Sequence, residues 1–204
     1  MNEKYVDDSF ALHTDLYQIN MAESYWADGM HNRKAVFELY FRQLPFGNGY
    51  AIFAGLERML NYLKDFRFSE TDIAYLRDEL HYKEDFIEYL KTIRFTGSVY
   101  SMAEGELVFA NEPIVRIEAP LVEAQLIETA LLNIVNYQTL IATKASRIKQ
   151  VVQKEIAMEF GTRRAQEMDA AVWGARAAVI GGFESTSNVR AGKLFNIPVS
   201  GTHA

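Results

Sequence analysis

The sequence predicts an α+β domain over residues 1–120, followed by linking helices and the first strand–helix units of a parallel α/β sheet or barrel over residues 121–204. Two observations carry this expectation. Helix signals fill most of the first hundred residues and give way to short strands. After residue 157, a strand, a glycine-containing turn and a helix alternate, which is typical of a parallel α/β sheet or barrel.

The first domain is predicted from local signals. Apolar residues three and four positions apart favour a helix over 16–26, and a run of β-formers favours a buried strand over 35–42. A stripe of apolar residues predicts a helix over 50–66. Ser69, followed by acidic residues, is a good N-cap for a third helix. A fourth helix is expected over 84–93.

The middle of the chain changes pattern twice. Short β-forming runs at 98–102, 106–109 and 114–117 are separated by turn residues and predict a compact antiparallel segment. The stretch 121–135 is apolar on most faces, and 137–152 continues with small residues and one basic face. We therefore expect two packed helices.

The last part of the chain predicts βα units. A strand over 157–160, a turn over 161–164 and an alanine-rich helix over 165–180 are followed by a helix that residues 185–188 can cap, and by a strand over 197–200. In parallel α/β folds, ligands bind beyond the carboxyl ends of the strands. The turns after these strands are therefore the places to look for a site.

Composition excludes several classes of protein. Hydrophobic residues make up 49% and charged residues 24%, which is not a disordered composition. No apolar run approaches the ~18–20 residues needed to span a bilayer, and the acidic N-terminus is not a secretory signal. The absence of cysteine excludes disulfides and thiolate chemistry and fits a cytoplasmic location. The net charge of −6 argues against nucleic-acid and membrane-surface partners.

The clearest chemical cluster is Glu-Phe-Gly-Thr-Arg-Arg at 159–164. A glycine lets a ligand approach the backbone, a following helix N-terminus attracts anions, and arginines grip phosphate or carboxylate. The alternative is a solvated turn in which Arg163 and Arg164 pair with Glu159 or Glu167. Spacing alone gives the two interpretations equal weight.

Three further segments have a functional and a structural interpretation. Residues 181–188 offer hydroxyl and amide donors, but helix capping explains them as well. His203, after a strand, has the chemistry of a general base. Tyr17, at the start of a helix, has a ring able to stack on a planar ligand, but a core tyrosine is the simpler interpretation.

In combination, the segments resemble one family, nicotinate phosphoribosyltransferase. The matching stretches are TDLYQINM (14–21), FRQLPFG (41–47), AGLER (54–58), EGELVF (104–109), QLIETALLN (125–133), ATKASR (142–147), EFGTRRAQ (159–166), GGFESTSNVRAG (181–192) and PVSGTHA (198–204). The resemblance implies a type II phosphoribosyltransferase-like fold with an irregular α/β barrel. It also implies synthesis of nicotinate mononucleotide and pyrophosphate from nicotinate and 5-phosphoribosyl 1-pyrophosphate in NAD biosynthesis.

The resemblance further implies ATP coupling through a phosphorylated histidine, magnesium, and active sites at the interface of a homodimer. It suggests these substrate-binding residues: Tyr17, Phe160, Arg163, Thr202, Ser185 and Ser187. Tyr17, from the partner subunit, and Phe160 would sandwich the nicotinate ring, as two aromatics can. Arg163 would lie near the substrate phosphates.

Thr202 matches a nicotinate-binding threonine. Ser185 and Ser187 stand where nicotinamide-using relatives carry an aspartate, which would repel a carboxylate ligand. The phosphorylated histidine of the family would follow Ala204, so we assign no catalytic residue, and His203 is not given that role. No metal ligand is assigned either.

The 204 residues match only the N-terminal portion of such an enzyme, so we expect the sequence to be truncated and inactive alone. Two alternatives are open. One is a non-catalytic binding or dimerisation module of the same fold. The other is a relative that uses nicotinamide or quinolinate.

Overall fold

The computed structural model describes residues 5–152 and 154–202, and these form two compact units. Unit 1 comprises Met1–Leu39, Glu57–Tyr100 and Val115–Asn133, and unit 2 comprises Tyr40–Leu56, Ser101–Ile114 and Ile134–Ala204. The units interleave along the sequence, because the chain passes between them more than once. The predicted boundary at residue 120 falls inside unit 1.

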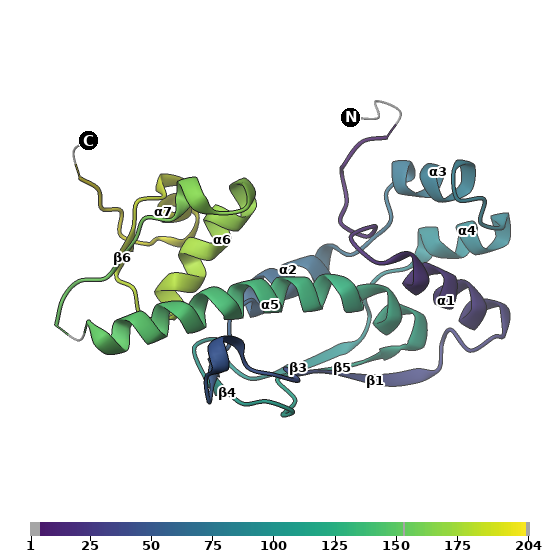
Figure 1. The fold of residues 1–204 in the computed structure, drawn as a ribbon. Coiled ribbons are helices and arrows are strands. Elements are labelled where there is room, and N and C mark those ends of the chain that lie inside the picture. The colour runs from purple at the N-terminus through teal and green to yellow at the C-terminus, as the bar shows by residue number, and fades with distance from the viewer. Residues whose placement is uncertain (1–4, 153, 203–204) are drawn as a thin grey trace. The chain divides into compact units, whose positions relative to one another are not determined.

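Unit 1 contains a three-stranded sheet in which β5 lies between β1 and β3 (Figure 1). Its strands are β1 (Lys34–Leu39), β5 (Val115–Pro120) and β3 (Ser98–Ser101). β1 and β5 are antiparallel, with Phe37 opposite Ile117. Buried and less buried residues alternate along β5, as expected for a strand with one face on a core.

The helices of unit 1 are α1 (Leu16–Ala27), α2 (Leu56–Asp65), α3 (Glu70–Asp78) and α4 (Glu84–Thr92). α1, α3 and α4 confirm the predicted helices to within a residue or two. At α3 the Ser69 hydroxyl accepts from the Asp72 backbone N–H, while the Asp72 carboxylate accepts from the Ser69 N–H. Trp26 of α1 packs on Phe86 of α4, with ring centroids 5.7 Å apart.

The predicted helix over 50–66 is wrong in its first part. β2 (Ala51–Ile52) precedes α2, and it pairs antiparallel with β4 (Leu107–Val108). Two threonine hydroxyls from the long helix α5 (Leu121–Val151) accept hydrogen bonds from this segment: Thr143 accepts from the Ile52 N–H at 2.9 Å, and Thr139 from the Ala54 N–H at 3.2 Å. In a helix, these N–H groups would donate to backbone carbonyls instead. The predicted single antiparallel segment is therefore divided, since β4 pairs with β2 and not with β3 or β5.

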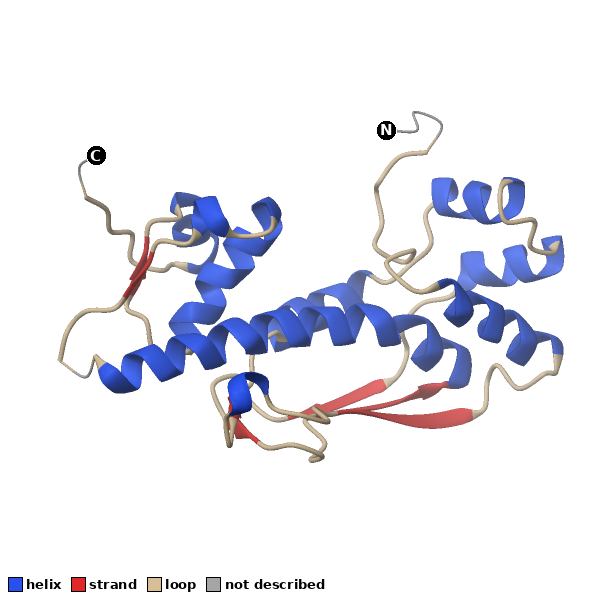
Figure 2. Cartoon of the chain, viewed as in Figure 1, coloured by secondary structure: helices blue, strands red, loops and turns tan. Residues whose placement is uncertain are grey.

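The two helices predicted over 121–152 are one helix. α5 (Leu121–Val151) is continuous over 31 residues, as Figure 2 shows. The sequence of α5 contains neither glycine nor proline, and the asparagine at position 136 carries only a small helix penalty. A polar residue within an apolar run therefore does not end the helix. None of the helices in the described ranges is both long enough and apolar enough to cross a membrane.

The predicted βα units are present in unit 2. The order is β6 (Met158–Glu159), η2 (Thr162–Arg164), α6 (Glu167–Ile180), β7 (Ser185–Thr186) and α7 (Val189–Phe195). β6 and β7 are parallel, and Thr186 forms a further parallel bridge with Val199. The predicted strand over 197–200 is reduced to that bridge. These segments confirm the beginning of a parallel α/β arrangement.

Small residues let α6 approach α5 within unit 2. A Cβ on Gly181 would lie 2.3 Å from the Ala142 carbonyl oxygen, and one on Gly174 would lie 2.7 Å from the Tyr137 hydroxyl. The Tyr137 hydroxyl donates to the Ala170 carbonyl at 2.7 Å. The Ala142 carbonyl belongs to the backbone of α5, so the space between the two helices requires glycine at position 181, whereas a Cβ at position 174 would displace the Tyr137 hydroxyl.

Candidate functional site

The carboxyl ends of the parallel segments in unit 2 carry four of the predicted site residues. Phe160 and Arg163 follow β6, Ser187 follows β7, and Thr202 follows the bridge at Val199. Because the three segments are parallel neighbours, the chain leaves them at the same edge of the sheet. We call residues 160–164, 187 and 202 the strand-end site.

The turn after β6 is held by bonds within itself. The backbone N–H groups of Arg164 and Ala165 donate to the Gly161 carbonyl at 2.8 and 3.0 Å. The Gly161 N–H is taken by the Glu159 carboxylate. The ring of Phe160 is 38% exposed, enough for a planar ligand to contact it.

The positive charge of the strand-end site comes from side chains more than from a helix terminus. Arg163 and Arg164 are exposed. The first turn of α6, by contrast, contains Glu167 and Asp169, whose charges oppose the binding of an anion at that helix N-terminus. An anion would therefore bind through the guanidinium groups, which can bind phosphate or carboxylate with two bonds.

The Glu159 carboxylate binds groups other than the arginines that the sequence suggested as its partners. One of its carboxylate oxygens accepts from the Gly161 N–H, and the other accepts from the Thr186 hydroxyl at 2.6 Å. The Thr186 oxygen also accepts from the Asn188 N–H at 3.0 Å, and Asn188 caps α7. This chain of bonds joins the ends of β6 and β7. In the sequence, the signal for this chain of hydrogen bonds was a glutamate at the end of a short predicted strand.

The two serines differ in position. Ser185 lies within β7 and is 4% exposed, and its hydroxyl has no hydrogen-bond partner among the described residues. Ser187 is part of the turn, and its N–H donates to the Glu159 carbonyl at 2.9 Å. The carboxylate of Glu184, just before them, already accepts hydrogen bonds from Lys149 and from the Ala157 N–H. Both bonds lower the pKa of this carboxyl, the one from Lys149 most.

Tyr17 belongs to unit 1 and is 49% exposed, so the interpretation of a core tyrosine is wrong. Its hydroxyl accepts from the Gln18 side chain at 2.8 Å and faces Glu128 of α5 at 3.5 Å. Desolvation, together with the charges of Glu128 and Asp15, raises the pKa of Tyr17, so the ring is neutral at physiological pH. The polar end is anchored while much of the side chain remains exposed.

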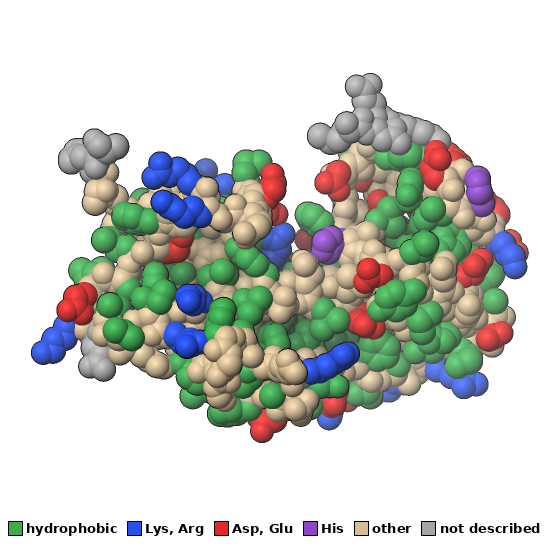
Figure 3. All heavy atoms as spheres, in the orientation of Figure 1, with side chains coloured by type: hydrophobic (Ala, Val, Ile, Leu, Met, Phe, Trp, Pro, Cys, Tyr) green, Lys and Arg blue, Asp and Glu red, His purple; other side chains and the backbone are tan. Residues whose placement is uncertain are grey.

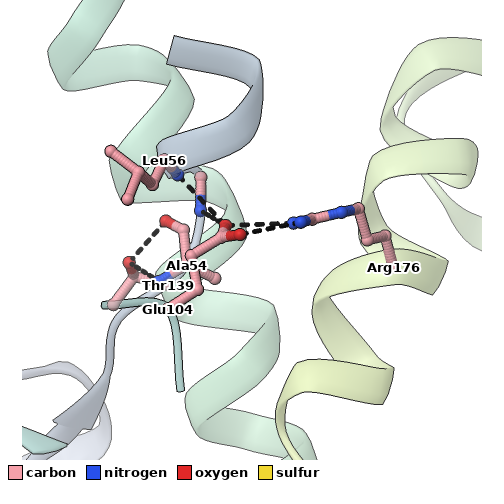
Figure 4. A network of polar contacts seen from close by, with 6 residues as sticks. Ala54, Leu56, Glu104, Thr139 and Arg176 are labelled. Carbon is pink, nitrogen blue, oxygen red and sulfur yellow. Dashed lines mark hydrogen bonds and ion pairs between the residues drawn. The ribbon is translucent and has the colours of Figure 1, made fainter. Parts of the chain in front are cut away.

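Sequence reasoning missed an ion pair in unit 2 (Figure 4). The Glu104 carboxylate accepts from the backbone N–H groups of Gly55 and Leu56, at 2.6 and 3.0 Å, and from both terminal nitrogens of Arg176, at 3.0 and 2.7 Å. Gly55 has φ +114°, a conformation that favours glycine. Burial acts to raise the pKa of Glu104, but the bonds from Arg176 and the two N–H groups lower it overall.

The remaining charges do not indicate a metal centre. Acidic, basic and hydrophobic side chains are interspersed on the face of the molecule in Figure 3. Within residues 5–152 and 154–202, no group of three or more His, Asp or Glu side chains could hold a metal ion. Mg²⁺ is commonly bound by one or two carboxylates together with substrate phosphates.

Taken together, an α+β unit and parallel βα units define a class: an α/β protein with exposed arginines in the turn at the carboxyl edge of its sheet. A family model of the nicotinate phosphoribosyltransferase N-terminal domain matches residues 12–136, more than half of the chain. The chain belongs to this family.

Curated relatives agree with this assignment. The chain is 74% identical over 200 residues to a nicotinate phosphoribosyltransferase of Bacillus subtilis, covering 98% of this chain and 41% of that protein. It is 45% identical to nicotinate phosphoribosyltransferase 1 of Arabidopsis thaliana, covering 93% of this chain and 34% of that protein. The chain thus spans about two fifths or less of the length of these relatives.

Solved structures show the same fold. The structure of human nicotinic acid phosphoribosyltransferase superposes with a TM-score of 0.87 at 38% identity, covering 94% of this chain and 39% of that one. A nicotinate-nucleotide pyrophosphorylase from Pyrococcus furiosus gives a TM-score of 0.78 at 22% identity, covering 100% and 46%. The second likeness concerns the fold alone.

Proposed function

We propose that this chain is the N-terminal part of an ATP-coupled nicotinate phosphoribosyltransferase. The reaction would join nicotinate to 5-phosphoribosyl 1-pyrophosphate, giving nicotinate mononucleotide and pyrophosphate, in the cytoplasm. The observation that carries the proposal is the 74% identity to the Bacillus subtilis enzyme over 200 residues, which includes residues 160–164 and 187 of the strand-end site. The βα units of unit 2 would be the start of an irregular barrel that further strands close.

The residues of the chain have defined tasks in this proposal. Phe160 stacks on the pyridine ring from one side, and Tyr17 of the partner subunit in a homodimer stacks from the other. Thr202 and the hydroxyls of Ser185 and Ser187 donate hydrogen bonds to the nicotinate carboxylate. Neutral donors suit this task because they hold no negative charge against the ligand.

Arg163 binds the phosphates of 5-phosphoribosyl 1-pyrophosphate. Its exposed guanidinium and the short turn that holds it support this role. ATP and magnesium, if bound, would supply a phosphoryl group and neutralisation of phosphate charge. Residues 1–204 contribute the ring-binding and phosphate-binding side chains.

A hybrid enzyme tests the proposal. Residues 1–204 of this chain are joined to the segment of the Bacillus subtilis relative that follows its matching region, and nicotinate mononucleotide formation is measured with ATP, Mg²⁺ and 5-phosphoribosyl 1-pyrophosphate. We expect activity in the hybrid and none in the 204-residue chain alone. A folded hybrid that forms no product, beside an active Bacillus subtilis enzyme, would refute the proposed function.

Two further arms identify the substrate and the phosphate-binding residue. When nicotinate, nicotinamide and quinolinate compete as substrates, the enzyme should prefer nicotinate. A preference for either of the other two would overturn the choice of substrate. Arg163→Ala should raise the KM for 5-phosphoribosyl 1-pyrophosphate by about tenfold or more, since a charge-assisted bond contributes ~1.5–3 kcal/mol. The control is Arg94→Ala, which removes an exposed arginine of unit 1.

A further inference from the structure

Arg176 stands on α6, the helix that directly follows the strand-end turn. Its two terminal nitrogens bind the two oxygens of Glu104 at 3.0 and 2.7 Å, and both side chains are largely buried, at 15% and 16% exposed. Glu104 also accepts from the first backbone N–H groups at α2. The carboxylate therefore fixes the guanidinium against a part of unit 2 that is distant in sequence.

The same guanidinium contacts α7. Its central carbon lies 5.7 Å from the centroid of the Phe195 ring, a cation–π distance. Trp173, on α6, packs on Phe195 with ring centroids 4.9 Å apart. Arg176 therefore links the two helices that follow β6 and β7. The turns before these helices carry Arg163 and Ser187.

We propose that Glu104 and Arg176 are positioning residues for phosphoribosyl transfer: the pair sets the placement of α6, and through it the turn that presents Phe160 and Arg163. The inference rests on the proposed function of the strand-end site. The link between α6 and the turn is short, because η2 packs on α6 and the Arg164 and Ala165 N–H groups both bind the Gly161 carbonyl.

Geometry, more than stability, explains an ion pair at this place. A buried ion pair adds little net stability compared with apolar side chains of similar volume, because both charges lose their hydration. A two-bond guanidinium–carboxylate contact, however, fixes both distance and orientation. A displacement of about 1 Å in a group that binds substrate can cost about 100-fold in rate.

The kinetic test uses the hybrid enzyme with Glu104→Gln, Arg176→Lys and both together. Arg176→Lys keeps the charge but loses the fixed two-bond geometry. We expect each single substitution to lower kcat/KM for 5-phosphoribosyl 1-pyrophosphate by about 10–100-fold. The double variant should lose little more than either single one, because both remove the same contact. Multiplying losses, or single variants that keep the unsubstituted kcat/KM, would overturn the proposal.

A second measurement separates positioning from general stability and from the proposed function. Hydrogen exchange, read by mass spectrometry, should become faster in residues 160–180 of both single variants while the far-ultraviolet spectrum remains that of a folded protein. Unchanged exchange in this segment would overturn the proposal even if activity fell. If the unsubstituted hybrid forms no product, the proposed function fails and exchange still decides the positioning role.

The matched control is Arg116→Lys in unit 1. Arg116 also binds a glutamate, Glu38, through its Nη2 at 2.7 Å, but the pair lies on the sheet with the side chains 50% and 34% exposed. This control should leave kcat/KM and the exchange of residues 160–180 unchanged. A loss equal to that of Arg176→Lys would show that any weakened arginine–glutamate pair lowers activity, and would contradict a specific role for Glu104 and Arg176.

Discussion

The two units are stabilised in different ways. Unit 1 buries large side chains completely, among them Phe86, Leu90 and Met59. In unit 2, two core clusters are built mainly on alanine, and its short strands are joined by side-chain hydroxyls as well as by the backbone. Most of the large side chains that are completely buried belong to unit 1, although Phe53 of unit 2 is among them. Unit 1 therefore depends mainly on filled volume, and unit 2 more on close approach and polar contacts. The candidate ligand-binding turns lie on the second kind of framework.

The largest expected effect concerns the volume buried in unit 1. Phe86 is fully buried and contacts Trp26 and Tyr89. Phe86→Ala should lower the free energy of unfolding by about 3–5 kcal/mol, because transfer and cavity costs add. Urea denaturation followed by circular dichroism measures it. Phe10, 62% exposed in the same unit, is the control, and a comparable loss in Phe10→Ala would contradict the assignment of the core.

A smaller loss is expected when the buried pair of unit 2 is broken. Arg176→Met leaves the Glu104 carboxylate without its cation and should cost about 2–3 kcal/mol, near the lower end for buried pairs since some exposure remains. The same urea experiment measures the loss. Arg116→Met, at the exposed pair of unit 1, should leave the unfolding midpoint nearly unchanged, and equal losses would remove the contrast between the units.

The difference between the units also explains which elements the sequence predicted. The helix after Ser69 was predictable because its capping residues are neighbours in sequence. β2 and the residues just after it were mistaken for helix because the Thr143 and Thr139 hydroxyls that bind their backbone come from a segment far along the chain. The pairing of β4 with β2 and the contact of Glu104 with Arg176 are likewise non-local. Local patterns hold little information about such contacts.

The strand-end site was partly predictable for the same reason. Turns after parallel strands bind ligands as a rule of the fold, so the turn that carries Arg163 could be placed from the predicted strand–turn–helix order, whereas the resemblance supplied the role of Phe160. The resemblance drew attention to Tyr17, whereas the residues alone favoured a core side chain. The role of Glu159 was not predicted, because its partner Thr186 becomes a neighbour only when β6 pairs with β7.

Close approach in unit 2 is tested by a single methyl group. Gly181→Ala places a Cβ against the Ala142 carbonyl, where only 2.3 Å is available, and should cost about 1–2 kcal/mol by forcing α6 away from α5. Thermal unfolding measures it. Gly49 of unit 2 is the matched control, since a Cβ there meets no atom within 4 Å. Equal effects at the two positions would show that helix contact is not the cause.

The smallest expected effect is on the acid side of the stability curve and compares Glu104 with Glu118 of unit 1. The pKa of each carboxyl is lowered in the folded protein, that of Glu118 chiefly by a hydrogen bond from Lys34. The ordinary glutamate pKa is ~4.3. As the pH falls towards that value, the unfolded chain takes up a proton before the folded chain does, which favours unfolding. The contribution of each group is therefore complete above about pH 5 and is lost as the pH falls through the lowered pKa.

Glu104→Gln should flatten the fall in unfolding free energy between about pH 5 and pH 3, because glutamine does not titrate in this range. Glu118→Gln should flatten it less, since its partner Lys34 is 72% exposed and water and salt screen the pair. The measurement is urea denaturation at several pH values, repeated with added salt. Salt should remove the Glu118 effect and leave most of the Glu104 effect. An equal response of both carboxylates to salt would mean that the Glu104 pair is as open to solvent as a surface pair, and that the contrast between the units does not extend to their charges.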